Sequence, residues 1–239
     1  MLETDVGDFQ KINAKGTPNE DRFRLLGGAV PLVARANRGQ MFAVMDGVGG
    51  APLGMRAAQL VADRLTEFFL DGPIPVNVDG LVQILHSTND EIAAWGVMPD
   101  GNRPLGACAA TVAWLCSTVN LDGTCDLVVL HAGDTAGAVL SNGVAKWLTH
   151  DHSAGRGLRN YVGRGAEFEL EIQQATLEPG DFVILVSDGV TRAMQLDGIA
   201  SIVKHRPIAG DAARSIVETA SRRGSRDDIT AVVVELLDV

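Results

Sequence analysis

Four short acidic motifs, far apart in the chain, contain the residues best suited to chemistry. They are Asn19-Glu20-Asp21, Asp46-Gly47-Val48-Gly49-Gly50, Ser187-Asp188-Gly189 and Arg226-Asp227-Asp228-Ile229-Thr230. Three of them adjoin apolar runs typical of buried strands, at residues 41–45, 182–186 and 229–237. Carboxylates at the ends of buried strands are costly to desolvate and repel one another when they converge. Because Mg²⁺ and Mn²⁺ prefer oxygen ligands and offset both costs, the sequence predicts an oxygen-rich metal site at strand ends.

The elements that must position these motifs follow from hydrophobic spacing and turn residues. Apolar residues at helical spacing predict helices over Pro52–Leu70, Asp79–Trp95, Asp197–His205 and Asp211–Arg222, the last two each capped by their first Asp. Short runs bounded by turn residues predict strands at 41–45, 108–117, 127–132, 137–140, 144–148, 168–175, 182–186 and 229–237. Hairpin signals at 120–123 and 141–143 favour antiparallel pairing. We therefore predict an α+β fold, sheet packed on sheet with helices outside, rather than a parallel doubly wound sheet.

Composition restricts the classes of partner and compartment. The 239 residues predict a single domain over 1–239, and the net charge of −10 argues against nonspecific nucleic-acid binding. No apolar run approaches the ~18 residues of a membrane span, and the N-terminus shows no signal-peptide pattern. Three cysteines without CxxC spacing fit a reduced compartment. We expect a cytoplasmic protein with no membrane partner.

Taken in order, the motifs resemble those of the metal-dependent protein phosphatases of type 2C, the PPM family. The resemblance spans roughly residues 5–236 and includes Gly133-Asp134-Thr135, Thr149-His150-Asp151-His152-Ser153 and Gly180-Asp181. It implies a four-layer α-β-β-α sandwich, two antiparallel sheets flanked by helices, with two Mn²⁺ or Mg²⁺ ions at one end. The ions would activate a water molecule that attacks phosphorus in line.

The same resemblance assigns roles to individual residues. It implies that Asp46 bridges the two metals, that the Gly47 carbonyl oxygen binds one of them, and that Asp188 and Asp227 bind the other. It also implies that Glu20 and Asp21 orient metal-bound waters. Asp134 would help Asp188 to bind a weaker third metal. The family usually has Asp-Asn where this chain has Asp227-Asp228, and the ligand there is the first residue. We therefore favour Asp227 over Asp228 as the ligand.

Three departures from the family pattern concern substrate binding. Gly16 stands where many relatives place an arginine that grips the phosphate, and Lys15 is the candidate to replace it as a point charge. Val48 replaces a histidine proposed as general acid, so the leaving group must take its proton from water or another residue. Only about 35 residues separate Asp151-His152-Ser153 from Asp188, too few for the helical flap of bacterial relatives. We expect an open site.

The leading hypothesis is a bacterial signalling hydrolase, a Mn²⁺- or Mg²⁺-dependent serine/threonine protein phosphatase. It would be a monomer that acts on a phosphorylated protein and reverses a serine/threonine kinase. A pseudophosphatase that binds a partner without turnover is the alternative that Gly16 and Val48 support, whereas intact Asp46, Asp188 and Asp227 oppose it. A small-molecule phosphoesterase is the third hypothesis, which a narrow closed pocket would favour.

Overall fold

A computed structural model describes residues 2–14, 16–71, 76–101, 103–155, 157–206 and 208–238. Its strands are β1 (Glu3–Lys11), β2 (Arg22–Leu26), β3 (Gln40–Gly47), β4 (Cys108–Val119), β5 (Cys125–Ala132), β6 (Ala136–Ser141), β7 (Val144–Trp147), β8 (Ser153–Ala154), β9 (Gly157–Leu158), β10 (Glu171–Leu177), β11 (Phe182–Val186) and β12 (Ile229–Asp238). Its helices are α1 (Pro31–Ala36), α2 (Gly54–Asp71), α3 (Val78–Ala93), α4 (Asp188–Thr191), α5 (Leu196–Lys204) and α6 (Ala209–Arg222), with a 3₁₀ turn, η1, at Gly165–Glu167. The helices in these ranges include no candidate for a membrane-spanning segment.

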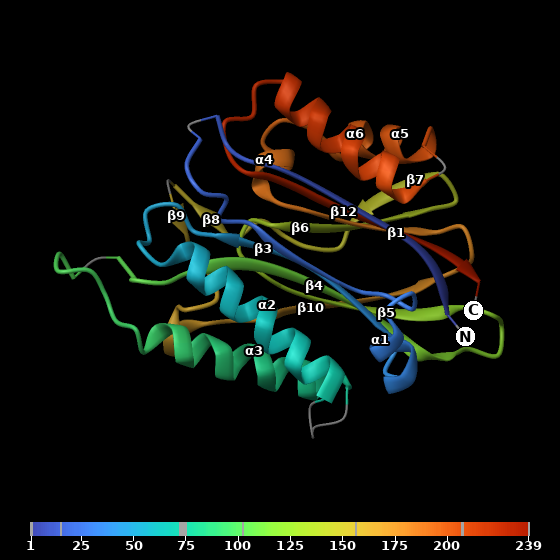
Figure 1. Cartoon of the computed structure of the whole chain (residues 1–239), viewed down its shortest axis with the longest axis horizontal. Helices are drawn as coiled ribbons and strands as arrows, with labels where there is room; N and C mark the ends of the chain where they lie inside the picture. The colour runs from blue at the N-terminus through green and yellow to red at the C-terminus, as the bar shows by residue number, and fades with distance from the viewer. Residues whose placement is uncertain are drawn as a thin grey trace.

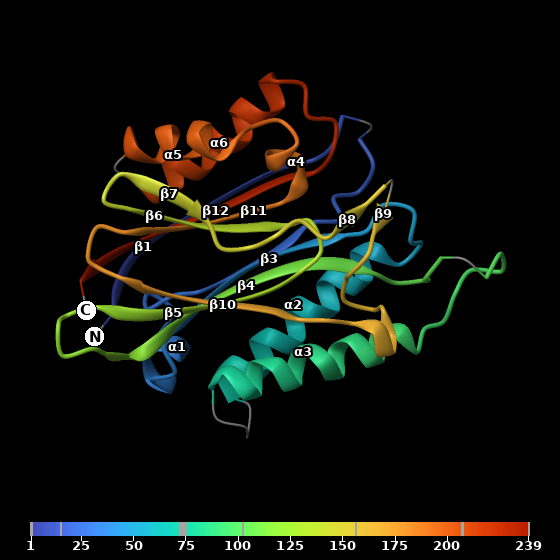
Figure 2. The same ribbon diagram turned by 180° about the vertical axis from the view of Figure 1, so that it is seen from behind.

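Two five-stranded antiparallel sheets lie face to face between two layers of helices (Figures 1 and 2). One sheet has the order β1-β12-β11-β6-β7, and the other has the order β10-β5-β4-β3-β2. Helices α2 and α3 cover the second sheet, and α5 and α6 cover the first. The predicted four-layer α-β-β-α sandwich is confirmed.

The central strands have two buried faces, which explains their continuous apolar runs. In β3, Met41, Ala43 and Met45 pack toward α2 and α3, whereas Phe42 and Val44 pack between the sheets. Strand β12 alternates in the same way between the α5–α6 layer and the inter-sheet core. Successive side chains of a strand point to opposite faces, so each such strand contributes to two hydrophobic layers.

The structure corrects several boundaries that the sequence predicts. Asp197 and Asp211 lie inside the first turns of α5 and α6 rather than at their N-caps, because these helices begin at Leu196 and Ala209. The strand predicted at 168–175 is shifted to Glu171–Leu177. The hairpin signals are confirmed, with Asn142 and Gly143 both at positive φ in the β6–β7 turn. Strands β1 and β2 and helices α1 and α4 were not predicted.

Close packing between β1 and α6 leads to the first testable prediction. A Cβ atom on Gly7 would lie 2.1 Å from the backbone nitrogen of Gly210, so Gly7→Ala must push α6 away from the sheet. Overpacking of this kind costs roughly 1–3 kcal/mol, and we expect the melting temperature to fall by about 5 °C. Thermal unfolding followed by circular dichroism measures the shift.

The facing glycine provides a matched control. A Cβ on Gly210 would meet no atom within 4 Å, so Gly210→Ala adds only helix propensity, worth up to about 1 kcal/mol of stability. The two substitutions should therefore move the melting temperature in opposite directions. A Gly7→Ala protein as stable as the wild type would contradict the close packing of α6 on β1.

Candidate metal centre

The four acidic motifs meet at one end of the sandwich because each lies at a strand end. Strand β2 begins directly after Asp21, β3 ends with Asp46 and Gly47, β11 leads into Asp188, and β12 begins directly after Asp228. They surround a cleft of about 400 Å³. It is lined by Glu20, Asp46, Gly47, Val48, Gly49, Asp134, Ser153, Gly155, Gly157, Leu158, Asp188, Arg192, Asp227 and Asp228. The cleft therefore contains residues from all four motifs.

Three carboxylates converge at the bottom of this cleft. Asp46, Asp134 and Asp188 each offer an oxygen within 4.8 Å of the others. Removal from water raises the pKa of Asp46 well above its usual range, and the charges of Asp21 and Asp188 raise it further. The pKa of Asp188 rises to about 8, first through burial and then through Asp134. This concentration of negative charge needs a cation to hold all the carboxylates in ionised form.

An orphaned oxygen tests whether the cluster fits a metal. Among the described residues, Oδ1 of Asp188 is buried and has no hydrogen-bond partner. A buried carboxylate oxygen without a partner carries a desolvation cost that a bound cation would remove. Together with the hard oxygen donors around it, this oxygen fits a divalent ion of the Mn²⁺ or Mg²⁺ kind.

Asp227 and Asp228 are neighbours in sequence but have different surroundings. Both oxygens of Asp228 are engaged by the chain: Oδ1 accepts from the backbone and side-chain nitrogens of Asn13, and Oδ2 accepts from the backbone nitrogen of Glu20. Asp228 is 5% exposed, whereas the Asp227 side chain is 52% exposed. Asp228 therefore ties the segment before β2 to β12, and Asp227 is the freer carboxylate at the cleft.

Asp21 and Glu20 lie behind and beside the central carboxylates. Asp21 is buried, its Oδ2 accepts a 2.6 Å hydrogen bond from the Thr230 hydroxyl, and its Oδ1 has no partner among the described residues. Burial raises the pKa of Asp21 to about 7. Burial also raises the pKa of Glu20, and the charge of Asp228 adds to it. Both residues extend the negative field of the cleft.

Glycines next to the carboxylates permit the backbones to approach closely. A Cβ on Gly189 would lie 2.0 Å from the carbonyl oxygen of Asp228, so only glycine lets α4 begin against the start of β12. A Cβ on Gly47 would lie 2.6 Å from the carbonyl carbon of Gly54 at the start of α2. The Asp-Gly pairs thus set the positions of Asp46 and Asp188 as well as forming turns.

Arg192 is the residue of the cleft that sequence reasoning missed. Its guanidinium contacts Asp188 through Nη2, lies 3.4 Å from Asp134 through the same nitrogen, and lies 2.9 Å from Asp227 through Nη1. A signal was available, since Arg192 follows Asp188 by four residues and therefore falls one helical turn away.

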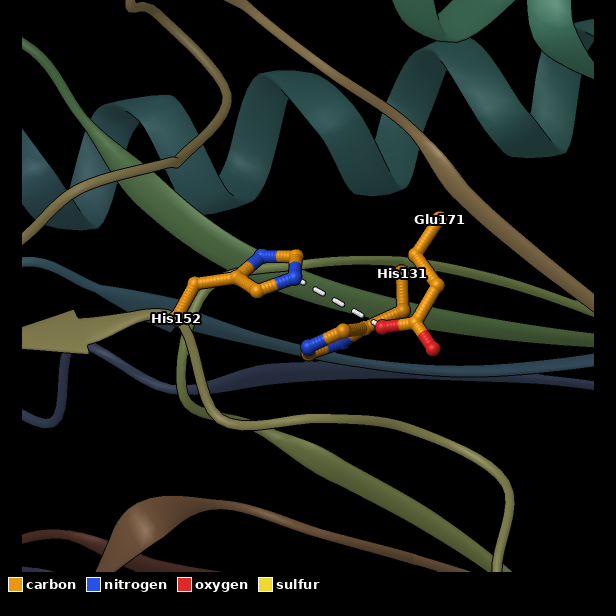
Figure 3. A group of neighbouring side chains, drawn as sticks. All are labelled: His131, His152 and Glu171. Carbon is orange, nitrogen blue, oxygen red and sulfur yellow. Dashed lines mark ion pairs between the residues drawn. The ribbon is translucent and has the colours of Figure 1, made fainter.

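A second cluster, of His131, His152 and Glu171, braces the loop that carries Asp134 (Figure 3). Both nitrogens of His131 are hydrogen-bonded, to the His150 carbonyl oxygen at 2.9 Å and to a threonine hydroxyl. His152 accepts from the backbone nitrogen of Gly133 through Nδ1 and lies 3.5 Å from Glu171 through Nε2. Burial lowers the pKa of His131 to about 4. The neutral imidazoles therefore hold this loop in place through hydrogen bonds.

The remaining sequence predictions concern the rim of the cleft. Lys15, the candidate for phosphate binding, lies outside the described residues. Between Ser153 and Asp188 the described part of the chain contains the β8–β9 hairpin, η1, β10 and β11, but no α-helix. The helical flap is therefore absent from those residues, and Ser153, Gly155, Gly157 and Leu158 border the cleft instead.

Comparison with known proteins identifies the class. The chain matches the model of the family Protein phosphatase 2C over residues 10–235. The chain belongs to the protein phosphatase 2C family and is an enzyme of that class.

Individual relatives agree with this assignment. A putative protein phosphatase 2C-type of Streptococcus pyogenes is 25% identical, covering 79% of this chain and 82% of its own length. The serine/threonine phosphatase of S. agalactiae superposes with a TM-score of 0.80 at 17% identity, covering 98% of this chain and 100% of its own. The catalytic domain of the phosphatase PstP, solved with two manganese ions, superposes with a TM-score of 0.78 at 22% identity, covering all of both chains. These structures share the fold.

Proposed function

We propose that the chain is a serine/threonine protein phosphatase that uses two divalent cations, Mn²⁺ or Mg²⁺, to hydrolyse phosphoserine and phosphothreonine. The observation that carries this proposal is the convergence of Asp46, Asp134 and Asp188 around an unpartnered Asp188 oxygen. Bound there, the cations would supply an activated water and neutralise charge on the phosphoryl oxygens. The relatives named for serine/threonine phosphatase activity support the substrate class.

The chain's own residues would hold the ions and set the position of the substrate. We assign Asp46, the Gly47 carbonyl oxygen, Asp188 and Asp227 as ligands, and Asp134 as a ligand of a third ion. Asp21 and Glu20 would accept hydrogen bonds from waters around the ions. The engagement of both Asp228 oxygens by Asn13 and Glu20 supports Asp227 rather than Asp228 as the ligand.

The shape of the site supports a protein substrate over a small phosphoester. The acidic cleft shares Asp134, Ser153, Asp188 and Arg192 with a second hollow of about 190 Å³. That hollow is lined partly by Trp147, Ala136, Met194 and Leu196. A groove that continues past the reacting centre can take side chains flanking a phosphorylated residue, whereas a small phosphoester would leave the second hollow empty.

We also propose the source of the substrate, the oligomeric state and the compartment of the enzyme. The substrate would be the product of a serine/threonine kinase, and the enzyme a monomer in the cytoplasm. The three cysteines are free thiols, which fits a reducing compartment.

Hydrolysis of a phosphothreonine peptide tests the proposed function. We expect phosphate release with Mn²⁺ or Mg²⁺, and loss of release when EDTA removes the metal. A wild-type protein that binds Mn²⁺ but releases no phosphate from peptides or an aryl phosphate would instead support the pseudophosphatase alternative, a binding-only role.

The neighbouring pair Asp227 and Asp228 sharpens this test. Asp227→Asn should lower phosphate release about 100-fold or more without lowering stability, since it removes an exposed ligand. Asp228→Asn should lower the melting temperature by several degrees, because it weakens buried hydrogen bonds to Asn13 and Glu20 worth roughly 1–3 kcal/mol. The reverse pattern would assign the metal to Asp228.

A further inference from the structure

The position of Arg192 suggests a role beyond pairing with carboxylates. The backbone at Arg192 is anchored on both counts that matter here. Val190, two residues before it, is buried, and the backbone nitrogen of Arg192 donates to the Asp188 carbonyl oxygen at 2.9 Å. Its side chain is 60% exposed and is held by ion pairs with carboxylates. An anchored backbone with an exposed cationic side chain at the cleft wall is well suited to binding an anionic ligand.

Apart from Arg192, the described charged residues that line the cleft are all acidic. Among the described residues that line it, Arg192 is the one cation, surrounded by six carboxylates. The guanidinium touches Asp134, Asp188 and Asp227 together. It therefore pairs with three of the carboxylates assigned above as metal ligands.

Metal ions and the guanidinium compete for the same oxygens. Cations that take the carboxylates of Asp188 and Asp227 remove the acceptors of Arg192 and repel its charge. With the backbone at residue 192 anchored, a displaced side chain would turn toward the open side of the cleft. A substrate phosphate would enter the cleft from that same open side.

We propose that Arg192 is a substrate-phosphate-binding residue, held by Asp134, Asp188 and Asp227 until metal binding releases it. This inference rests on the proposed function of the site. A guanidinium presents planar paired donors that match two oxygens of a phosphate, which a lysine cannot do.

Calorimetric titrations with Arg192→Gln separate phosphate binding from metal binding. Loss of one or two charge-assisted hydrogen bonds should weaken binding of inorganic phosphate to the Mg²⁺-loaded protein about 10- to 100-fold. Binding of Mn²⁺ to the metal-free variant should be as tight as in the wild type or up to about tenfold tighter, because a competing cation is gone. KM for a phosphothreonine peptide should rise by more than kcat falls.

Two further variants complete the experiment. Arg192→Lys keeps the charge without the planar donor pair and should fall between wild type and Arg192→Gln. Arg222→Gln, on α6 and paired with Glu218, is the exposed control and should match the wild type.

The outcomes separate this inference from the proposed function. Weaker Mn²⁺ binding by Arg192→Gln would show that Arg192 merely organises the carboxylates, and unchanged phosphate binding would show that it does not reach the substrate; either result overturns the inference. A larger loss of phosphate binding in Lys15→Gln than in Arg192→Gln also overturns it. Arg192-dependent phosphate binding in a protein without hydrolytic activity would support the inference and refute the phosphatase.

Discussion

Replacement of Asp188 by asparagine is expected to abolish metal-dependent phosphate release and, at the same time, to stabilise the metal-free protein at alkaline pH. The loss of activity follows from the position of Asp188 among the converging carboxylates. Removing an ionised ligand should cost several kcal/mol of transition-state stabilisation, or a rate decrease of about 1,000-fold or more. Phosphopeptide hydrolysis and Mn²⁺ titration calorimetry measure the two parts of this loss.

The gain in stability has a separate physical cause. Asp188 is buried beside Asp134, and its pKa of about 8 means that ionising it in the folded protein is unfavourable. An asparagine keeps the shape and carries no charge, so the metal-free protein no longer bears this cost above pH 8. After allowance for the weakened contact with Arg192, we expect roughly 1–3 kcal/mol, or a melting temperature higher by about 3–10 °C.

An exposed carboxylate provides the control for this variant. Asp63 on α2 pairs with Arg24 at the surface, so Asp63→Asn should change stability by at most about 1 kcal/mol and leave hydrolysis unchanged. If Asp188→Asn retained Mn²⁺ affinity, the metal would not be held by Asp188. If it destabilised the metal-free protein at high pH, the raised pKa of Asp188 would be contradicted.

The metal-free protein is expected to lose stability as the pH rises from 6.5 to about 8.5. Burial raises the pKa of Asp21 to about 7 and that of Asp188 to about 8, from an ordinary value of 3.8. In the unfolded chain these groups are already ionised at pH 6.5, whereas the folded chain still holds their protons. The folded state therefore binds more protons than the unfolded state, and its stability falls as they are released.

Above pH 6.5 the change in stability reports these carboxylates rather than the buried histidines. The pKa of His131 is lowered to about 4 from its ordinary value of 6.5, so its effect on stability runs in the opposite direction but ends near pH 6.5. Between pH 6.5 and about 8.5 we expect a loss of roughly 2 kcal/mol, or about 4–8 °C in melting temperature. Thermal unfolding in EDTA across this range measures it.

Addition of Mn²⁺ is the matched condition for this series. Bound cations favour the ionised carboxylates and should flatten the pH dependence while raising the melting temperature throughout. A metal-free melting temperature that stays constant or rises over the same range would contradict the raised pKa values of Asp21 and Asp188.

Most of the regular structure could be predicted from local sequence because it is strongly patterned. Helices α2, α3 and α6 show apolar residues at helical spacing, and the central strands are short apolar runs between turn residues. Strand β1 escaped prediction since Gly7 is its one fully buried residue and polar side chains fill most of its other positions. Its partner, β12, lies at the opposite end of the chain, so only the folded protein reveals the pairing.

The acidic site divides in the same way between local and tertiary information. The sequence by itself determined which carboxylates stand at strand ends, since an apolar strand and the acid next to it are covalently linked. It could not determine that Asp228 turns toward Asn13 while Asp227 is open to solvent, because adjacent residues point in different directions only once the strand is placed.

The position of Arg192 among the carboxylates and the raised pKa values depend on the tertiary structure alone. The folding of β11 and β12 side by side, with Gly189 pressed against Asp228, brings Arg192 to Asp134 and Asp227 from distant parts of the chain. Desolvation and Coulomb interactions depend on distance in space and on access to water, neither of which is contained in the order of residues. The sequence determined the chemical groups and the strands that carry them, and the tertiary structure decided which charges face one another.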